Sequence, residues 1–219
     1  MQSVSFKRKK LRFQQFSIFA EISTLPLSQK VQAVEEVFRL LDLEIAEFQG
    51  WAKLSCKAGC GKCCEKPDLE ATVLEFLPFA YRMFLAGEAY HWLDRLNAHQ
   101  RNICVIYDES IFVGGCQQYL HRGLICRLFG FSARLNKHGQ REIVTCQIIK
   151  TEQMEAYASA LEQVRAGRQV PVLSHYYMRL HAIDPDLSRY FFPVNDAIRR
   201  AIELVLHYFS YRDDGASAA

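Results

Sequence analysis

The sequence predicts a mainly α-helical fold with a small β-hairpin, in which an irregular cysteine-cluster core is flanked by N- and C-terminal helices. Three observations support this prediction. Apolar residues recur at steps of three and four near both ends of the chain, as on the buried face of a helix. Alternating apolar residues at 129–135 precede turn-forming residues, which is typical of a hairpin. Four of the eight cysteines fall between Cys56 and Cys64.

Length and composition indicate one folded domain. The chain has 219 residues, half of them hydrophobic, with a formal net charge of only +3, which is enough for one core and too mild to imply nucleic acid as a partner. The one dense basic patch, at residues 7–12, is interpreted as a solvated N-terminal arm. We predict a single domain over residues 1–219, with the cysteine-cluster core at 52–146 and flanking helices at 28–51 and 150–211.

The cellular compartment is predicted from the apolar runs. None approaches the roughly 20 residues that a membrane span needs. Glu21 interrupts the short apolar segment behind the basic arm, so no secretory signal is expected. We therefore expect a cytoplasmic protein without a membrane span. A reducing compartment disfavours disulfides, and the cysteine content is below the roughly 8–10% of disulfide scaffolds.

The first two helices are predicted from apolar stripes and boundary residues. One should start at Ser28 as its cap and reach the neighbourhood of Trp51. A second should run from an Asp68 cap towards Gly87, with Pro78 kinking or dividing it.

Shorter elements are predicted in the rest of the chain. Residues 103–107 look like a β-strand, and Gly114 and Gly115 look like a turn. A hairpin is expected from 129–135 to 143–145 through a turn at 136–139. The remaining helices are expected at 90–96, 154–164 and 173–180, and from an Asn195 cap to residue 209.

The cysteine-rich segment has the chemistry of a metal site. Its thiols are spaced C-x3-C-x2-C-C, and thiolates bind soft or borderline metals. Nearby cations lower thiol pKa values and so favour the anion. Four lysines lie in or beside the segment and are expected to compensate its charge. They are Lys53, Lys57, Lys62 and Lys66.

One ion cannot be held by this segment alone if it is a straight helix. All four thiols would share an arc of roughly 100°, but Cys56 and Cys64 would stand about 12 Å apart along the axis. Zinc–sulfur bonds are only about 2.3 Å long. Gly59 and Gly61 favour a bent loop, which we expect to enter a helix at Cys63 or Cys64. Further ligands should therefore come from elsewhere, although each remaining cysteine could also be a small buried hydrophobe. The candidates are Cys104, Cys116, Cys126 and Cys146.

The combined cysteine pattern resembles the YkgJ-type cysteine-cluster family. The first cluster is followed by Cys116-x2-Tyr119-x2-Arg122-x3-Cys126-Arg127, and the resemblance covers roughly residues 52–146. The family is described as a zinc- or iron-chelating domain and includes the flagellin lysine N-methylase FliB. Gly123 stands where it usually has proline, and Gln118 where it usually has a β-branched residue. The resemblance implies a ligand set of Cys56, Cys60, Cys63, Cys64, Cys104, Cys116, Cys126 and Cys146.

Residues around the later thiols complete the prediction. Pairing in the hairpin should place Cys146 opposite Phe129 or Gly130, roughly 13 Å along the strand from Cys126. Only the resemblance therefore makes Cys146 a ligand of the same centre. Arg122 and Arg127 are expected to balance thiolate charge, with ordinary surface arginines as the alternative. His121 is the histidine nearest to the cysteines in sequence and could be a spare ligand.

Several kinds of centre and function fit these residues. Eight cysteines could make two four-cysteine zinc sites, one zinc site with spare thiols, or an Fe–S cluster such as [4Fe–4S]. We therefore predict a metal-binding protein for zinc or iron, with no catalytic residue assigned. One alternative is a methyltransferase using S-adenosylmethionine, suggested only by FliB. The sequence has no Gly-x-Gly-x-Gly turn after a strand to support it. Another is a structural zinc module with a surface for a protein partner.

Overall fold

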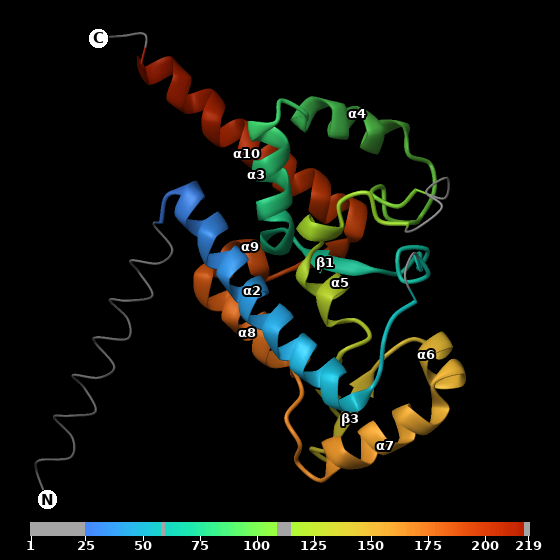
Figure 1. Ribbon diagram of the computed structural model, residues 1–219. Helices are drawn as coiled ribbons and strands as arrows, with labels where there is room; N and C mark the ends of the chain where they lie inside the picture. Colours follow the sequence, from blue (N-terminus) through green and yellow to red (C-terminus); the bar gives the residue numbers. More distant parts are fainter. Residues whose placement is uncertain (1–24, 58–59, 109–114, 217–219) are drawn as a thin grey trace, which may run out of the picture.

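The computed structural model describes residues 25–57, 60–108 and 115–216. The basic arm at 7–12 and Gly114 lie outside the described residues. Helices dominate, with two short antiparallel strand pairs, so the predicted fold class is confirmed. Helix α2 (Leu27–Ala52) lies beside α8 (Leu173–Ile183), and the long α10 (Val194–Ala216) packs against α3 (Leu77–Leu85) and α4 (Ala89–Ala98) (Figure 1). No helix in this described part is both long and apolar enough to cross a membrane.

Helix α2 forms where its apolar stripe predicts it. The stripe buries Val34, Leu41 and Phe48, each at most 1% exposed. Ser28 is not its cap, because the helix begins one residue earlier and Pro26 occupies the capping position without a side-chain hydrogen bond. The fixed φ of proline favours entry into a helix, so a capping side chain is not required. At the other end, Lys53 adopts a left-handed conformation (φ 56°) and turns the chain into the cysteine segment.

The segment after Asp68 does not form the predicted single helix. It forms three elements instead, β1 (Glu70–Thr72), the 3-10 helix η1 (Leu74–Phe76) and α3. Strand β1 pairs with β4 (Phe191–Pro193), so pairing with a distant segment overrides the local helical pattern. Pro78 lies in the first turn of α3, where a missing N–H costs nothing, so it neither kinks nor divides a helix.

The predicted hairpin is confirmed and belongs to a second buried cluster. Strands β2 (Ser132–Leu135) and β3 (Arg141–Val144) pair antiparallel, and Asn136 accepts two backbone hydrogen bonds within the turn. Helices α6 (Gln147–Glu152) and α7 (Met154–Arg165) follow the hairpin. Together with the end of α2 they bury a cluster that includes Phe48, Leu54, Ile143, Ile149 and Val164. The larger cluster lies among α2, α3, α4, α8 and α10.

Residues 103–107 do not form the predicted strand. Only Tyr107 makes a β-bridge, to Cys116. The side chain of Asn195, which was expected to cap the last helix, satisfies this backbone instead. Its Oδ1 accepts from the Val105 N–H and its Nδ2 donates to the Ile103 carbonyl, both at 2.8 Å. A backbone whose polar groups are paired with a side chain needs no neighbouring strand.

The remaining elements are short. A 3-10 helix and a one-turn helix follow the second cysteine loop, and a four-residue helix begins at Pro185 under an Asp184 cap. They are η2 (Tyr119–His121), α5 (Leu124–Leu128) and α9 (Pro185–Ser188). The helices predicted around 90–96, 154–164 and 173–180 are confirmed as α4, α7 and α8.

Candidate metal centre

The first cysteine segment is a loop with tight turns. The Cys60 N–H donates to the Lys57 carbonyl at 3.0 Å, and the Cys64 N–H donates to the Gly61 carbonyl at 2.8 Å. No helix begins at Cys63 or Cys64, contrary to expectation, because the turn at Gly61 directs the chain towards β1. The thiols of this loop therefore do not share one helical face, and they turn towards two different neighbourhoods.

Five thiols form an inner set, drawn from four separate places in the chain. The Cys104 N–H donates to the Cys64 carbonyl at 3.2 Å, which joins the first loop to the second. Burial, and then the nearby thiols of Cys116 and Cys63, raise the pKa of Cys104 to about 12. Burial also raises the pKa of the Cys126 thiol, as do Cys104, Glu75, Cys63 and Cys116 around it. The inner set is Cys63, Cys64, Cys104, Cys116 and Cys126.

Within the inner set, the adjacent thiols of Cys63 and Cys64 are close enough to interact. The Cys64 thiol donates to Cys63, which lowers the pKa of Cys63 and raises that of Cys64. Arg122 lowers the pKa of Cys63 further. One thiolate stabilised by a thiol and a guanidinium is the state in which sulfur is a metal ligand.

Three thiols form an outer set, Cys56, Cys60 and Cys146. Burial, followed by Cys60, Cys63 and Cys146, raises the pKa of Cys56 to about 11. The register places Cys146 near Gly130 as predicted, since the Gly130 N–H donates to the Val144 carbonyl at 2.9 Å. Cys146 then caps α6, with its sulfur accepting from the Ile149 N–H at 3.5 Å. It therefore lies with the start of the first loop and not with Cys126.

Gln153 brings the outer set together. Its side-chain oxygen accepts from the Ser55 N–H at 2.9 Å, and its side-chain nitrogen donates to the Ser55 carbonyl at 2.7 Å. These two bonds join segments 98 residues apart and attach Ser55, next to Cys56, to the end of α6, the helix whose N-terminus is capped by Cys146. Nothing in the local sequence signals this pairing, because a half-buried glutamine between two helices has no distinctive pattern.

Replacement of Gln153 with alanine is expected to loosen the outer set and to leave the inner set intact. Two side-chain hydrogen bonds are lost, so the free energy of unfolding should fall by about 1–2 kcal/mol. In the reduced protein without metal, alkylation of Cys56 and Cys146 should become faster, as read by peptide mass spectrometry. Glu162→Ala, at an exposed position of α7, is the control. Equal acceleration at Cys104 would contradict the role given to Gln153.

Glu75 supports the loop that carries Cys126. Its carboxylate accepts from the N–H and hydroxyl of Thr72 (2.6 and 3.1 Å) and from the Ile125 N–H (2.8 Å). It is fully buried, and burial raises its pKa to about 7 although these hydrogen bonds oppose the shift. Gly123 leaves the space that this needs, since a Cβ there would lie 3.1 Å from Glu75 Oε2 and 2.9 Å from Phe76. The sequence does contain one sign of this role, because Glu75 is the single charged residue in the otherwise mainly apolar run at 71–80.

Tyr107 joins the two cysteine loops. Its ring lies between two glycines, because a Cβ on Gly61 or on Gly115 would stand 2.1 or 2.0 Å from its Cε2. Its hydroxyl donates to Glu65 at 2.7 Å. The absence of side chains at these glycines therefore allows the first loop to pack closely against the loop of Cys116. The sequence pattern had indicated only a bend in the first loop at Gly61.

The charged residues near the thiols divide into two groups. Arg122 stacks on Tyr119 at 3.9 Å, contributes to the lowered pKa of Cys63, and opposes the rise that burial causes in the pKa of Cys116, in line with the predicted charge balance. Arg127 does not have this role, because it pairs with Asp42 and donates to the Leu120 carbonyl at 2.7 Å. His121 lies in that same region and not beside the thiols, so it is not a spare ligand.

The residues fit a thiolate-bound metal by type but are not closed around one. Within the described ranges, no three His, Cys, Asp or Glu side chains are already arranged to hold an ion. All eight cysteines are free thiols. A cavity of about 230 Å³ reaches three inner-set thiols and is flanked by Lys66, Asp68 and Glu70. Three thiols of the inner set, Cys63, Cys64 and Cys126, are thus accessible from this cavity.

The sequence was compared with protein-family models, with curated proteins and with solved structures. Residues 55–159 match the model of the CxxCxxCC family, described as "Putative zinc- or iron-chelating domain". This match confirms the resemblance inferred from the cysteine spacing and extends it through α6 into α7. Neither the comparison with curated proteins nor that with solved structures gave a match.

Proposed function

We propose, from the membership of residues 55–159 in this zinc- or iron-chelating family, that the protein binds zinc or iron through its cysteine thiolates. The observation that carries the proposal is the gathering of eight thiols, distant in sequence, into two neighbouring sets. Thiolate sulfur is a ligand of choice for zinc and for Fe–S clusters. We expect this to take place in a reducing compartment such as the cytoplasm.

The division of the thiols suggests how they would be used. A single zinc ion takes four ligands, and the inner set offers five thiols. Cys63 also lies near Cys56, so it can complete the outer set to four. Two zinc sites, or one [4Fe–4S] cluster held by the inner set, satisfy this arrangement. Two zinc sites would stabilise the fold, whereas a [4Fe–4S] cluster would also allow one-electron transfer.

No observation favours the methyltransferase alternative. The structural zinc module with a protein-binding surface requires the same ligands, and it differs in predicting that chelation unfolds the chain. Binding of the metal should also release protons, since the cation replaces those that burial now retains on the thiols. Metal content and fold stability are therefore the properties to measure together.

Protein purified without oxygen should contain at least about one zinc or iron per chain, measured by metal analysis together with an absorption spectrum. A visible band that bleaches on reduction indicates Fe–S, and its absence together with zinc indicates zinc sites. Removal of the metal should lower the melting temperature by about 10 °C or more, because metal binding contributes folding energy. Cys64→Ser should lose most of the metal, whereas Ser174→Ala, on the exposed face of α8, should retain it.

The proposal fails if the protein carries neither metal after anaerobic reconstitution. It also fails if Cys64→Ser and Cys126→Ser, checked by circular dichroism for retained helices, bind metal as well as the wild type. Persistence of the fold after complete chelation would exclude the purely structural module while leaving metal binding in place.

A further inference from the structure

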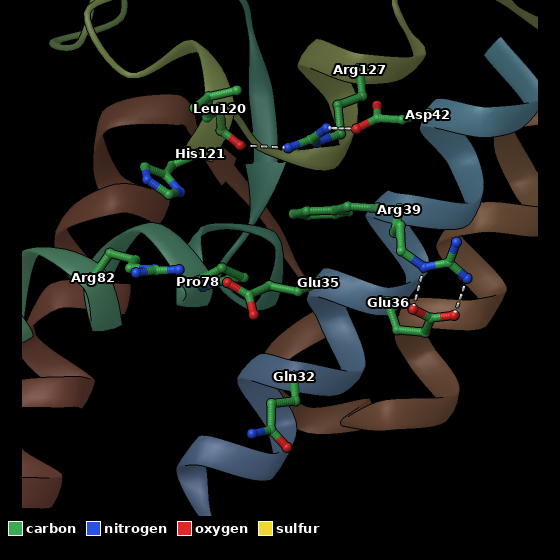
Figure 2. Close-up of a pocket in the computed structure, with 11 residues that line it drawn as sticks. Gln32, Glu35, Glu36, Arg39, Asp42, Pro78, Arg82, Leu120, His121 and Arg127 are labelled. Atoms are coloured by element: carbon green, nitrogen blue, oxygen red, sulfur yellow. Dashed lines mark hydrogen bonds and ion pairs between the residues drawn. The ribbon is translucent and has the colours of Figure 1, made fainter. Parts of the chain in front are cut away.

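A second pocket, separate from the thiols, lies between α2, α3 and the segment from η2 to α5. Its volume is about 530 Å³, and no cysteine lines it. Phe38 and Pro78, both buried, contribute apolar surface. Charged residues of both signs surround this surface, and Figure 2 shows them pointing in from separate elements.

Two of the charge pairs are satisfied internally. Arg39 binds Glu36 through two hydrogen bonds of 2.7 Å. Arg127, only 7% exposed, pairs with Asp42 and is stacked on the ring of Phe38 at 4.7 Å. These four charges fix the wall of the pocket formed by α2 and α5, and they are not available to a ligand without the loss of an existing bond.

Three other groups are available. Within the described ranges, the side chains of Glu35, Arg82 and His121 make no hydrogen bond or ion pair. Figure 2 shows them around one open space, away from the Arg39–Glu36 pair. They lie close enough to act on one another, since burial and then Arg82 lower the pKa of His121, and Glu35 opposes this. His121 is therefore neutral at pH 7 and can donate or accept one hydrogen bond.

The formal charges that line the pocket sum to zero, and among the described residues Arg82 and Glu35 are the two that are not already paired with each other or with a neighbour. Arg39, Arg82 and Arg127 oppose Glu35, Glu36 and Asp42. A simple anion would be attracted by Arg82 but repelled by the free carboxylate of Glu35. A simple cation would be attracted by Glu35 but repelled by Arg82. A molecule that carries both a carboxylate and an ammonium group can pair with both, and each such charge-assisted hydrogen bond contributes about 1.5–3 kcal/mol.

We propose that this pocket binds a small zwitterion of the amino-acid class. Arg82, with the His121 ring, receives the carboxylate, Glu35 receives the ammonium group, and the side chain lies on Phe38 and Pro78. No cysteine lines the pocket, so its ligand binding is independent of the proposed thiolate site.

The test is calorimetric titration of the metal-loaded, full-length protein. The probes are the 20 free L-amino acids and a series of linear ω-amino acids of two to six carbons, which measures the spacing of the two charged groups. At least one probe should bind, and Arg82→Gln and Glu35→Gln should each weaken it by about tenfold or more. Arg189→Gln and Glu203→Gln, at exposed positions elsewhere, should leave the Kd unchanged.

Derivatives of the bound probe assign its two ends. N-acetylation of the probe, which removes its ammonium charge, should weaken binding to the wild type by about tenfold or more but change binding to Glu35→Gln little. Amidation, which removes its carboxylate charge, should likewise weaken binding to the wild type but change binding to Arg82→Gln little. The proposal is overturned if no probe binds at about 10 mM, if both substitutions leave the Kd within about twofold, or if acetate or methylamine binds as well as the zwitterion.

Discussion

Replacement of Glu75 with alanine is expected to lower the free energy of unfolding by about 3–5 kcal/mol and to reduce metal retention. The change leaves the buried N–H groups of Thr72 and Ile125 without acceptors and opens a cavity between β1 and α5. Since α5 carries Cys126, the inner set should lose its order before the rest of the fold does. Urea unfolding and metal analysis measure the two effects.

The control for this change is Glu203→Ala, which removes an exposed carboxylate from α10 and should change stability by less than about 0.5 kcal/mol. If Glu75→Ala is equally neutral, the support assigned to this carboxylate is wrong. A loss of stability with full metal retention would show that Glu75 supports the fold and not the thiol set.

Glu75 also predicts a specific pH dependence. Its folded pKa of about 7 is above the ordinary 4.5, so folded protein retains a proton that unfolded protein has lost. The stability that it contributes is therefore present below pH 4.5 and lost as the pH rises through 7. Between pH 5 and pH 8, wild type should lose roughly 2–3 kcal/mol relative to Glu75→Gln, whose side chain does not titrate. A constant difference across this range would contradict the buried carboxyl group.

Replacement of Gly61 with alanine is expected to destabilise the protein by about 2–3 kcal/mol through overpacking. The new Cβ would stand 2.1 Å from the Tyr107 ring, which must move and give up its hydrogen bond to Glu65. The loop of Cys116 would then separate from the first cysteine loop, and metal content should fall. Chemical denaturation and metal analysis again provide the measurements.

A matched control is available at Gly50, inside α2. A Cβ there has nothing within 4 Å, so Gly50→Ala should raise stability by roughly 0.5–1 kcal/mol through helix propensity. Addition of Tyr107→Leu to Gly61→Ala should recover part of the loss, because the smaller side chain relieves the contact. If Gly61→Ala behaves like Gly50→Ala, the close packing of Tyr107 is refuted.

The helices could be predicted from sequence where their determinants are local. The apolar stripe of α2 and the hairpin turn at Asn136 both depend on neighbouring residues. Strand β1 could not be predicted in this way, because its partner β4 lies near the other end of the chain. Pairing with β4 overrides the local helical pattern of the β1 segment. Asn195 was misassigned for a similar reason, since its side chain has partners in a segment far away in sequence.

The candidate site was predictable in composition but not in arrangement. The spacing of the first four thiols and the family resemblance of the other four named the candidate ligands, and the structure brings thiols from elsewhere in the chain beside those of the first loop. The division into inner and outer sets depends on Gln153, Tyr107 and Glu75, whose contacts are long-range. Such contacts leave only weak traces in a single sequence, such as a glycine or an isolated charge.

The outer set has a consequence for how the protein unfolds. Cys146 packs on the smaller buried cluster, whereas Cys63 packs on the larger one. An ion that drew ligands from both would act as a cross-link between two hydrophobic cores that otherwise share mainly α2. The metal would then determine the cooperativity of the molecule, so that the loaded chain melts as one unit and the empty chain as two.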